Sequence, residues 1–470
     1  MSRGKALLKN TAILMVAKVS TQVINFLLLP LYTAVLSTIE YGTVDVITSL
    51  SMILLPFATL QLEQGIFRYL IQAQTDELKE QILTSGIFCI GVVVLIVSIC
   101  YFIVCGFITV ENAILIYLYY LSMVFNTVLL QVCRGFGANI QYGVGSFLAS
   151  SLAVCLNVPL VAVLGFGISG ILLSSIIANI ISTIYMSMSI HIGRYFRRKS
   201  FTCSVLKDEL NFSVPLVFNQ ISSWVINYSN RLIIIYFWGM GANGIFSLAS
   251  KFSSILSTFF GVYNIAFTEN IVKSSEDKDS HAYFSKLLNV TVQLYLCLIT
   301  LIINLLPLIF SFMVNENYYD AYLHIPILIV AMFFSGMAAT LGSIYIAYSR
   351  TKEIGITTAL SGVVNIIVHV SLLQALHLYA ASLSTMISFV VLFVYRYIKI
   401  QSFVPVRLEV KSVVFQTTIL VISWIAYVTK SSYLISVGIC LNVVYIILWL
   451  LRYKEILANS LKIKRGFIFK

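Results

Sequence analysis

Charged residues are scarce in this chain: only 10% of its 470 residues are Asp, Glu, Lys or Arg, while 59% are hydrophobic. Soluble domains carry about a quarter of their residues as charges, so a soluble protein of this length is excluded. Runs of about 20 apolar residues, the length that crosses a bilayer as an α-helix, recur from end to end. They do not alternate as the strands of a membrane barrel do. The sequence therefore predicts an all-α, polytopic membrane protein.

Motifs for catalysis, nucleotide binding and metal binding are also missing. The chain has no P-loop, no HExxH and no GxSxG, and its five histidines lack metal-ligand spacing. Its eight cysteines form no CxxC pair and lie mostly in apolar runs, so we expect free thiols. We therefore predict that the protein is not an enzyme and has no catalytic residue, no metal and no cofactor.

The apolar runs divide into fourteen predicted transmembrane spans joined by short links. The first run follows a basic flank like that of a signal peptide. It is too long for one and lacks a small-residue cleavage site, so we expect it to be retained as a helix. The spans are predicted near residues 12–36, 43–62, 82–106, 113–132, 144–164, 168–190, 213–238, 244–264, 287–313, 322–347, 355–375, 378–397, 412–429 and 433–451.

The basic residues, which give a net charge of +12, gather on one side of the predicted membrane. With a cytoplasmic N-terminus, all but four of the 30 Lys and Arg fall in cytoplasmic links and tails. Lys430 lies in an outer link, and Lys18, Arg231 and Lys251 lie inside spans. This is the positive-inside pattern, so the positive charge does not indicate a nucleic-acid partner. Both termini are expected in the cytoplasm.

The stretch that opens the chain returns 202 residues later. The tripeptide Val-Ile-Asn at 23–25 recurs at 225–227, and Gly42 recurs as Gly244. Six predicted spans separate the copies, so both have the same orientation, as in transporters built from parallel repeats. We predict a pseudo-symmetric pair of six-helix lobes over residues 1–200 and 201–400, followed by two helices and a basic tail over residues 401–470.

Three polar residues, Lys18, Gln22 and Asn25, share one face of the first span because they are spaced i, i+4, i+7. A lysine at the centre of a membrane costs about 2.5–3.5 kcal/mol on insertion scales. This face is therefore expected to turn toward protein or water rather than lipid.

The seventh and eighth spans carry a second polar set. Gln220, Asn227 and Arg231 share a face of the seventh span, and Lys251 lies in the eighth. We predict that both polar sets line a substrate path, with the three cations binding a phosphate-bearing anion. The alternatives are hydrogen bonding between packed helices and, for Arg231, extension of the side chain to the membrane surface.

Three acidic residues, Asp45, Glu63 and Glu269, lie at the ends of predicted spans and are candidates for binding a coupling ion. The alternative for Asp45 is that it caps its helix. The alternative for Glu63 is that it pairs with Arg68 at the membrane interface.

The ordered set of features in the first two spans resembles the bacterial oligosaccharide (Wzx-type) flippases of the multidrug/oligosaccharidyl-lipid/polysaccharide exporter superfamily, which is MATE-like. The features are a short basic N-terminus, Pro30-Leu31-Tyr32, then Glu40-Tyr41-Gly42, and a second span that closes with Glu63 to Arg68. The Gly244 restart, the fourteen spans and the length extend the resemblance over essentially the whole chain.

The resemblance implies two six-helix lobes around a central cavity, with cavity cations for an anionic cargo. It also implies translocation of undecaprenyl-pyrophosphate-linked oligosaccharide repeat units across the bacterial inner membrane, for surface polysaccharide such as O-antigen of lipopolysaccharide or capsule. Partners would be this lipid-linked substrate, membrane lipid, and the polysaccharide polymerase and chain-length machinery.

Two other functions remain open at this point. An ion-coupled drug exporter of the same superfamily would be expected to have twelve spans and an acidic cavity. A polysaccharide polymerase or ligase would need a large outer loop, and the outer links of this chain are short.

Overall fold

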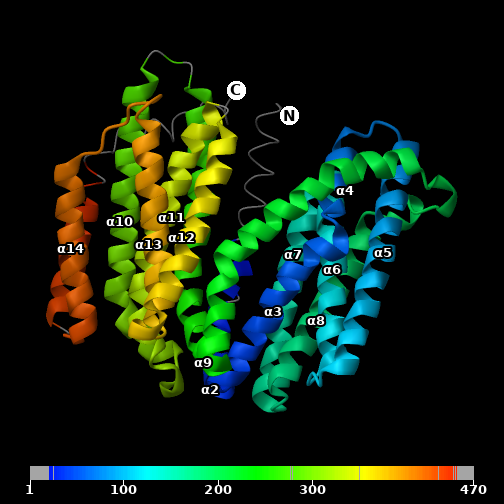
Figure 1. Ribbon diagram of the computed structural model, residues 1–470, viewed down its shortest axis with the longest axis horizontal. Coiled ribbons are helices and arrows are strands. Elements are labelled where there is room, and N and C mark those ends of the chain that lie inside the picture. Colours follow the sequence, from blue (N-terminus) through cyan, green and yellow to red (C-terminus); the bar gives the residue numbers. More distant parts are fainter. Residues whose placement is uncertain are drawn as a thin grey trace. The chain divides into compact units, whose positions relative to one another are not determined.

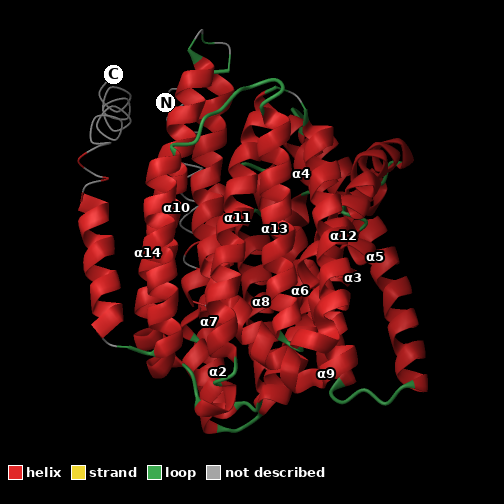
Figure 2. Ribbon diagram, turned by 60° about the vertical axis from the view of Figure 1, so that its left-hand side comes forward, coloured by secondary structure: helices red, strands yellow, loops and turns green. Residues whose placement is uncertain are grey.

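The computed structural model is helical throughout the part of the chain that it describes, which contains no strand (Figure 2). The described residues are 19, 21–24, 26–275, 277, 279–348, 350–431, 433–447, 449 and 451. The chain divides into two compact units, and Figure 1 labels their helices. The first unit covers the described residues of Ala6–Ile235 together with Gly239–Gly244. The second covers those of Ile245–Lys470 together with Tyr236–Trp238.

The first unit is built from helices that follow the predicted spans closely. Their order is α2 (Leu29–Val35), α3 (Thr38–Thr59), α4 (Leu62–Gln72), α5 (Asp76–Phe107), α6 (Ala113–Gly135), α7 (Asn139–Asn157), the π-helix η1 (Val158–Val163), α8 (Gly167–Ser189), two short 3-10 turns η2 (Ile192–Arg194) and η3 (Arg198–Ser200), and the first part of α9 (Cys203–Lys273).

Local sequence signals explain where α3 begins and ends. Ser37 caps its start: the hydroxyl accepts from the Glu40 amide, and the Glu40 carboxylate accepts from the Ser37 amide at 2.9 Å. This reciprocal capping box satisfies two amides that the first turn would leave unpaired. At the other end, Leu60 and Gln61 both adopt left-handed conformations and separate α3 from α4. The second predicted span thus ends at this break, and Glu63 belongs to the next helix.

The seventh and eighth predicted spans lie in α9 (Cys203–Lys273), which consists of two helices that meet at a kink. Its geometry is interrupted at Gly239, whose φ of 79° and ψ of −178° are open to glycine but not to other residues. Among the described residues, eleven helices are long and apolar enough to cross a membrane, and two shorter apolar helices lie at Thr21–Val35 and Tyr433–Ile447. With α9 spanning two predicted segments, this is consistent with about fourteen spans.

The second unit packs around α11. Its elements are the last part of α9, α10 (Ser280–Met313), the 3-10 turn η4 (Glu316–Tyr318), α11 (Ala321–Ala347), α12 (Thr351–Leu376), α13 (Tyr379–Ile400) and α14 (Val410–Thr429). Helix α11 is the most buried of these, and α13 packs against both α11 and α12 (Figure 1).

Arg396 holds these three helices together. We counted this residue with the cytoplasmic links from the sequence, but it lies within α13 and is only 4% exposed. Its guanidinium donates to the Ala338 carbonyl of α11 at 2.7 Å, and on α12 to the Ile354 carbonyl and to the hydroxyls of Thr357 and Thr358. The buried cation is therefore fully engaged by neutral acceptors and is unavailable to a ligand.

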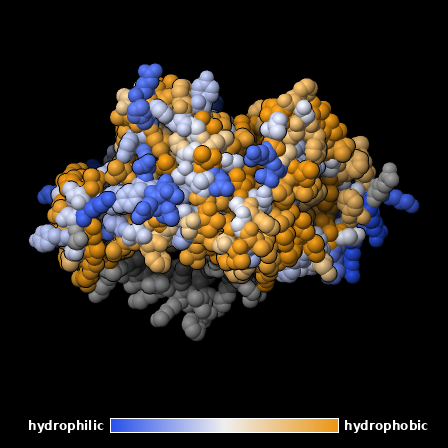
Figure 3. Space-filling model, turned by 90° about the horizontal axis from the view of Figure 1, so that it is seen from below, coloured by the Kyte–Doolittle hydropathy of each residue, from blue (hydrophilic) through white to orange (hydrophobic). Residues whose placement is uncertain are grey.

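Large apolar side chains cover much of the surface, as expected for helices that meet lipid rather than water. Figure 3 shows broad hydrophobic areas on the face it presents. On α5, Leu95, Ile96 and Phe102 are 62%, 53% and 48% exposed. A soluble protein would not expose such a row on a single helix.

Helices α3 and α9 cross within the first unit at two glycines that the 202-residue repeat relates. A Cβ atom on Gly42 would overlap the Met240 carbonyl oxygen, and one on Gly244 would overlap the Thr38 carbonyl oxygen. Thr38 and Met240 are themselves 202 residues apart, so each repeat copy makes the same contact with the other. The crossing is therefore a pseudo-two-fold contact that brings the two backbones together.

We expect Gly42→Ala and Gly244→Ala to destabilise the protein strongly, because each added methyl group meets backbone that a side-chain rotation cannot relieve. The matched controls are Gly91→Ala and Gly106→Ala on α5, where a Cβ atom has nothing within 4 Å. These should be neutral or stabilising by up to about 1 kcal/mol, since alanine is the better helix former. Thermal unfolding of the purified proteins tests the contrast. Equal melting temperatures for both pairs would contradict the crossing.

Candidate functional site

An ion pair lies beside the α3–α9 crossing. The Arg231 Nε of α9 donates to the Asp45 Oδ2 of α3 at 2.7 Å, and the two side chains are only 13% and 9% exposed. Asn243 of α9 donates from the same amide nitrogen to Asp45 Oδ2 at 3.3 Å and to the Gly42 carbonyl at 3.2 Å. The pair and the amide tie α3 to α9 on both sides of the Gly239 interruption.

Aromatic side chains extend this network along α9. The Arg231 guanidinium lies over the Tyr228 ring at 4.7 Å, and that ring stacks on Trp224 with centroids 5.7 Å apart. The Trp224 indole donates to the Ser49 carbonyl of α3 at 2.8 Å. Such a cation–π contact adds to the ion pair where water is excluded. The guanidinium is thus positioned by both a carboxylate and a ring.

The ion pair breaks the symmetry of the repeat. At the offset of 202 residues, Asp45 corresponds to Ser247, and Arg231 corresponds to Leu29. No second acid–base pair therefore accompanies the first. The backbone contact is two-fold, but its charges are not.

Two of the predicted site residues, Arg231 and Asp45, are brought into direct contact, although they were predicted for different roles. The arginine was expected to bind substrate and the aspartate a coupling ion. The alternative in which Asp45 caps its helix is wrong, because the cap of α3 is Ser37. The alternative in which Arg231 extends to the membrane surface does not fit its position against Asp45.

The other predicted substrate residues are distributed along the chain. Lys18 and Asn25 lie outside the described residues, and the side chain of Asn227 is likewise not described. Gln22 is half-buried on the Thr21–Val35 helix, while Gln220 of α9 is exposed. Lys251, also on α9, is exposed in the second unit. That these residues line a substrate path remains a prediction.

The remaining two acids differ in environment. Glu269 is exposed near the end of α9. Glu63 is 2% exposed at the start of α4, where burial raises the pKa of its carboxyl group. No lysine or arginine nitrogen among the described residues lies within ion-pair distance of Glu63, so the proposed Glu63–Arg68 pair is not formed. Within the described chain no cluster of three His, Cys, Asp or Glu suits a metal ion.

Arg68 instead lies in an open groove of about 310 Å³ between α4 and α9 of the first unit. Its guanidinium packs over the Phe212 ring at 4.2 Å, with its side chain exposed. The groove lining combines polar and apolar side chains: Gln64, Phe67, Arg68, Ile71 and Gln72 of α4 and Phe212 and Leu216 of α9. A cation with flanking amides and apolar walls suits an amphiphile with an anionic head group.

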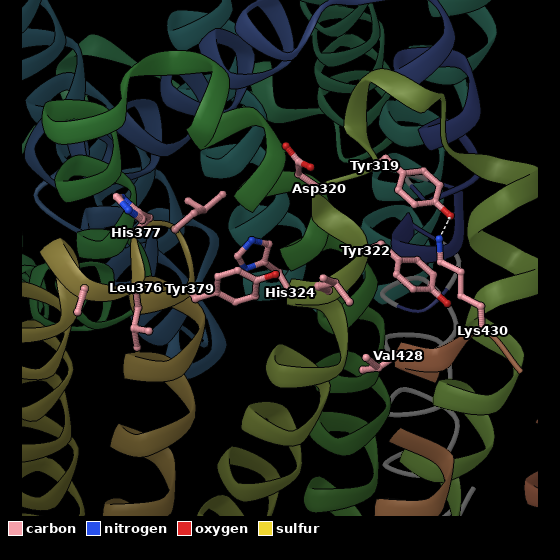
Figure 4. A pocket seen from close by; sticks show the side chains of 12 residues that line it. Tyr319, Asp320, Tyr322, His324, Leu376, His377, Tyr379, Val428 and Lys430 are labelled. Carbon is pink, nitrogen blue, oxygen red and sulfur yellow. Dashed lines mark hydrogen bonds between the residues drawn. The ribbon is translucent and has the colours of Figure 1, made fainter. Parts of the chain in front are cut away.

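The second unit has its own hollow, of about 560 Å³, where the first turns of α11 and α13 meet the last turns of α12 and α14 (Figure 4). Lys430 donates to the Tyr319 hydroxyl at 2.7 Å and lies over that ring. His324 and Tyr379 face one another with ring centroids 4.4 Å apart. Rings with hydroxyl and imidazole groups can hold polar, ring-shaped ligands such as sugars.

Sequence reasoning missed Asn243, Arg68 as a groove residue, and this hollow. Asn243 is next to Gly244, but no local pattern shows that its amide reaches Asp45. The residues of the hollow are far apart in sequence and meet because α11 and α13 begin where α12 and α14 end.

Comparison with known proteins identifies the family and the fold. A family model described as "Polysaccharide biosynthesis protein" matches residues 7–268, more than half of the chain. No curated protein sequence matches the chain. The solved structure "Lipid II flippase MurJ, inward closed conformation" superposes with a TM-score of 0.73 at 15% identity, covering 96% of this chain and 100% of that one.

Multidrug transporters have the same fold. An inward-facing MATE family transporter of the MOP superfamily matches with a TM-score of 0.68 at 15% identity, over 83% of this chain and 98% of that one. An outward-facing MATE transporter matches with a TM-score of 0.58 at 16% identity, over 85% and 96%. At these identities the likeness concerns the fold.

We expect Arg231→Ala to destabilise the protein by about 3 kcal/mol, because it leaves the Asp45 carboxylate buried without its cation. The double variant Asp45→Asn/Arg231→Gln removes both charges and should recover most of that loss. Lys79→Ala, which removes a more exposed pair with Asp76, is the control and should cost less than about 1 kcal/mol. Denaturation of the purified variants measures the differences. A double variant as unstable as the single one would show that the pair itself is not what stabilises the crossing.

Proposed function

Because the chain belongs to the polysaccharide biosynthesis protein family and has the fold of lipid flippases and multidrug exporters, we propose that it is a lipid-linked oligosaccharide flippase. Its cargo is an undecaprenyl-pyrophosphate-linked repeat unit of a surface polysaccharide such as O-antigen or capsule. The protein lies in the bacterial inner membrane with both termini in the cytoplasm, and it passes the cargo on to polymerase and chain-length machinery.

The observation that carries this proposal is the family match over residues 7–268, which contains α3, α4 and most of α9. These helices form the Asp45–Arg231 network and the Arg68 groove. The groove offers a cation and two amides beside apolar walls, which suits a phosphate head group attached to a polyprenyl chain.

If transport proceeds by alternating access, in which the cargo site opens to one side of the membrane at a time, the α3–α9 crossing has a role in the transport cycle. In the present state Gly42 and Gly244 hold the two helices together, and Arg231 is occupied by Asp45. A pyrophosphate that reaches Arg231 competes with Asp45 for the same guanidinium. Cargo binding would then weaken the ion pair and favour a state in which α3 and α9 separate. The size of this shift is set by how much more tightly the cargo binds the separated state than the present one.

The second candidate is an ion-coupled exporter of small molecules, favoured by the likeness in fold to MATE transporters and by the half-buried Asp45 and the buried Glu63. The two candidates differ in what accumulates when the gene is deleted. Loss of a flippase leaves lipid-linked repeat units on the cytoplasmic face and removes surface polysaccharide. Loss of a drug exporter raises sensitivity to cationic toxins and leaves surface polysaccharide unchanged.

We expect Arg68→Ala to lower the rate of polysaccharide export about 10–100-fold, the loss that corresponds to a charged hydrogen bond of about 1.5–3 kcal/mol. Arg68→Lys keeps the charge but not the planar guanidinium and should retain part of the activity. Arg350→Ala is the control, because Arg350 is an exposed arginine of the second unit paired with Glu353. Export is measured as surface polysaccharide at matched protein levels. Full export by the Arg68→Ala variant would exclude the groove from the cargo path.

The three cations inside predicted spans provide a separate test of the path. Lys18→Ala, Arg231→Ala and Lys251→Ala should each reduce export, because each removes a charge that balances the pyrophosphate. The stability-matched background for Arg231 is the Asp45→Asn/Arg231→Gln double variant. If all three substitutions leave export intact in protein that reaches the membrane, the hypothesis that these cations line the cargo path is wrong.

A further inference from the structure

A glutamate near the start of α9, Glu209, is enclosed within the first unit and has no role in the site described above. It precedes the seventh predicted span, residues 213–238, and is 0% exposed. Neither of its carboxylate oxygens has a hydrogen-bond partner among the described residues. One turn further along α9, the Ser213 hydroxyl is equally buried and also lacks a partner there.

Two glycines make room for this carboxyl group. A Cβ atom on Gly65 of α4 would overlap the Ser213 hydroxyl and would lie 3.3 Å from the Glu209 carbonyl oxygen. A Cβ atom on Gly86 of α5 would lie 3.2 Å from Glu209 Oε2 and 2.7 Å from the Ile66 side chain. Any larger residue at either glycine would occupy this space. The carboxyl group is therefore enclosed where α4, α5 and α9 meet, next to the apolar core that these helices share.

The charges around Glu209 do not favour its ionised form. On α5, the titratable side chain close enough to interact electrostatically with Glu209 is Cys89, which is not a cation. On α4, the nearest acid in sequence is Glu63, which is itself buried, while Arg68 is turned to the Phe212 ring. The α9 neighbours Lys207 and Asp208 are exposed. Within the described chain no cation lies within ion-pair distance of Glu209.

A carboxylate that has lost its water and gained neither a cation nor a donor is strongly unfavourable, so the group takes up a proton instead. Burial accordingly raises the pKa of Glu209 to about 9. The neutral acid brings an O–H donor to a site whose other polar group is the Ser213 hydroxyl.

We propose that Glu209 is a proton-binding site: its carboxyl group carries a proton at neutral pH while α9 is docked on α4 and α5 at Gly65 and Gly86. Release of the proton requires water to reach the carboxylate, and therefore requires this part of α9 to separate from the two glycines. Because α9 also carries Arg231 and Gly244, proton binding at Glu209 is coupled to the position of α9 at its crossing with α3. This inference does not depend on the cargo.

Infrared spectroscopy of the purified, cargo-free protein tests the site directly. A protonated carboxyl group has a carbonyl stretch that an ionised one lacks. We expect one such band of a buried acid to persist at neutral pH, to disappear near pH 9 and to be absent from Glu209→Gln. The band should remain in Glu77→Gln, which changes an exposed glutamate of α5, and in Glu63→Gln, which removes the other buried acid of this region. Absence of the band in the natural protein, or its loss in Glu63→Gln with retention in Glu209→Gln, would overturn the proposal.

The pH dependence of stability provides a second measurement. The folded protein binds a proton at Glu209 with a pKa of about 9, whereas the unfolded chain releases it near the ordinary value of 4.5. The stability that this group contributes is therefore fully present below the unfolded value, falls as pH rises between the two values, and changes no further above them. The melting temperature of Glu209→Gln should lack this decline with pH. At alkaline pH the backbone amides at the start of α9 should exchange hydrogen more slowly in this variant than in the natural protein.

Parallel curves of melting temperature against pH for the two proteins would show that Glu209 does not hold the proton. Because no transport is measured, failure of the flippase proposal would leave both results unchanged.

Discussion

A charge that is removed from water has to be matched by a partner or cancelled by a proton, and the charged groups buried in this helical protein use different solutions. Asp45 and Arg231 neutralise one another across two helices. Arg396 has no acidic partner among the described residues but donates to carbonyl and hydroxyl oxygens of two neighbouring helices, α11 and α12. Glu209 has neither among the described residues, which leaves protonation. The packing of the helices around each group determines whether its charge is paired, hydrogen-bonded or cancelled by a proton.

The close approach of α3 and α9 is what makes the first solution possible. Side chains larger than hydrogen at Gly42 or Gly244 would hold the helices apart, and the short Asp45 side chain would then not reach the guanidinium at 2.7 Å. Asn243 fills the remaining position by donating to both Asp45 and the Gly42 carbonyl. Packing and charge are therefore not separate contributions here, because the glycines decide whether the ion pair can form.

Much of the fold could be predicted from the sequence, since hydrophobic runs report membrane helices with little dependence on context. The helix class, the approximate span count and the family followed from those runs and from ordered motifs near the N-terminus. The cap of α3 was not predicted, because Asp45 was considered as the capping residue and the structure has Ser37 there. The kink between the two helices of α9 was less accessible, because a glycine such as Gly239 can continue a helix or interrupt it.

The candidate site was harder to predict, because its contacts join distant residues. The repeat drew attention to Gly42 and Gly244, but an alignment of two segments does not show that the segments touch. Asp45 and Arg231 are 186 residues apart, and no pattern near either residue identifies the other. Glu209 lies at the edge of the repeated stretch, and only the surrounding helices reveal that it is buried without a partner.

The ion pair also makes the two halves of the chain chemically dependent. In a dimer of identical subunits every contact across the two-fold axis would occur twice, the glycine contact and an acid–base pair alike. In this chain the glycine contact occurs twice but the ion pair once, because Leu29 and Ser247 stand at the second pair of positions. The first half, produced alone, would therefore carry an acid whose counter-ion is encoded in the second.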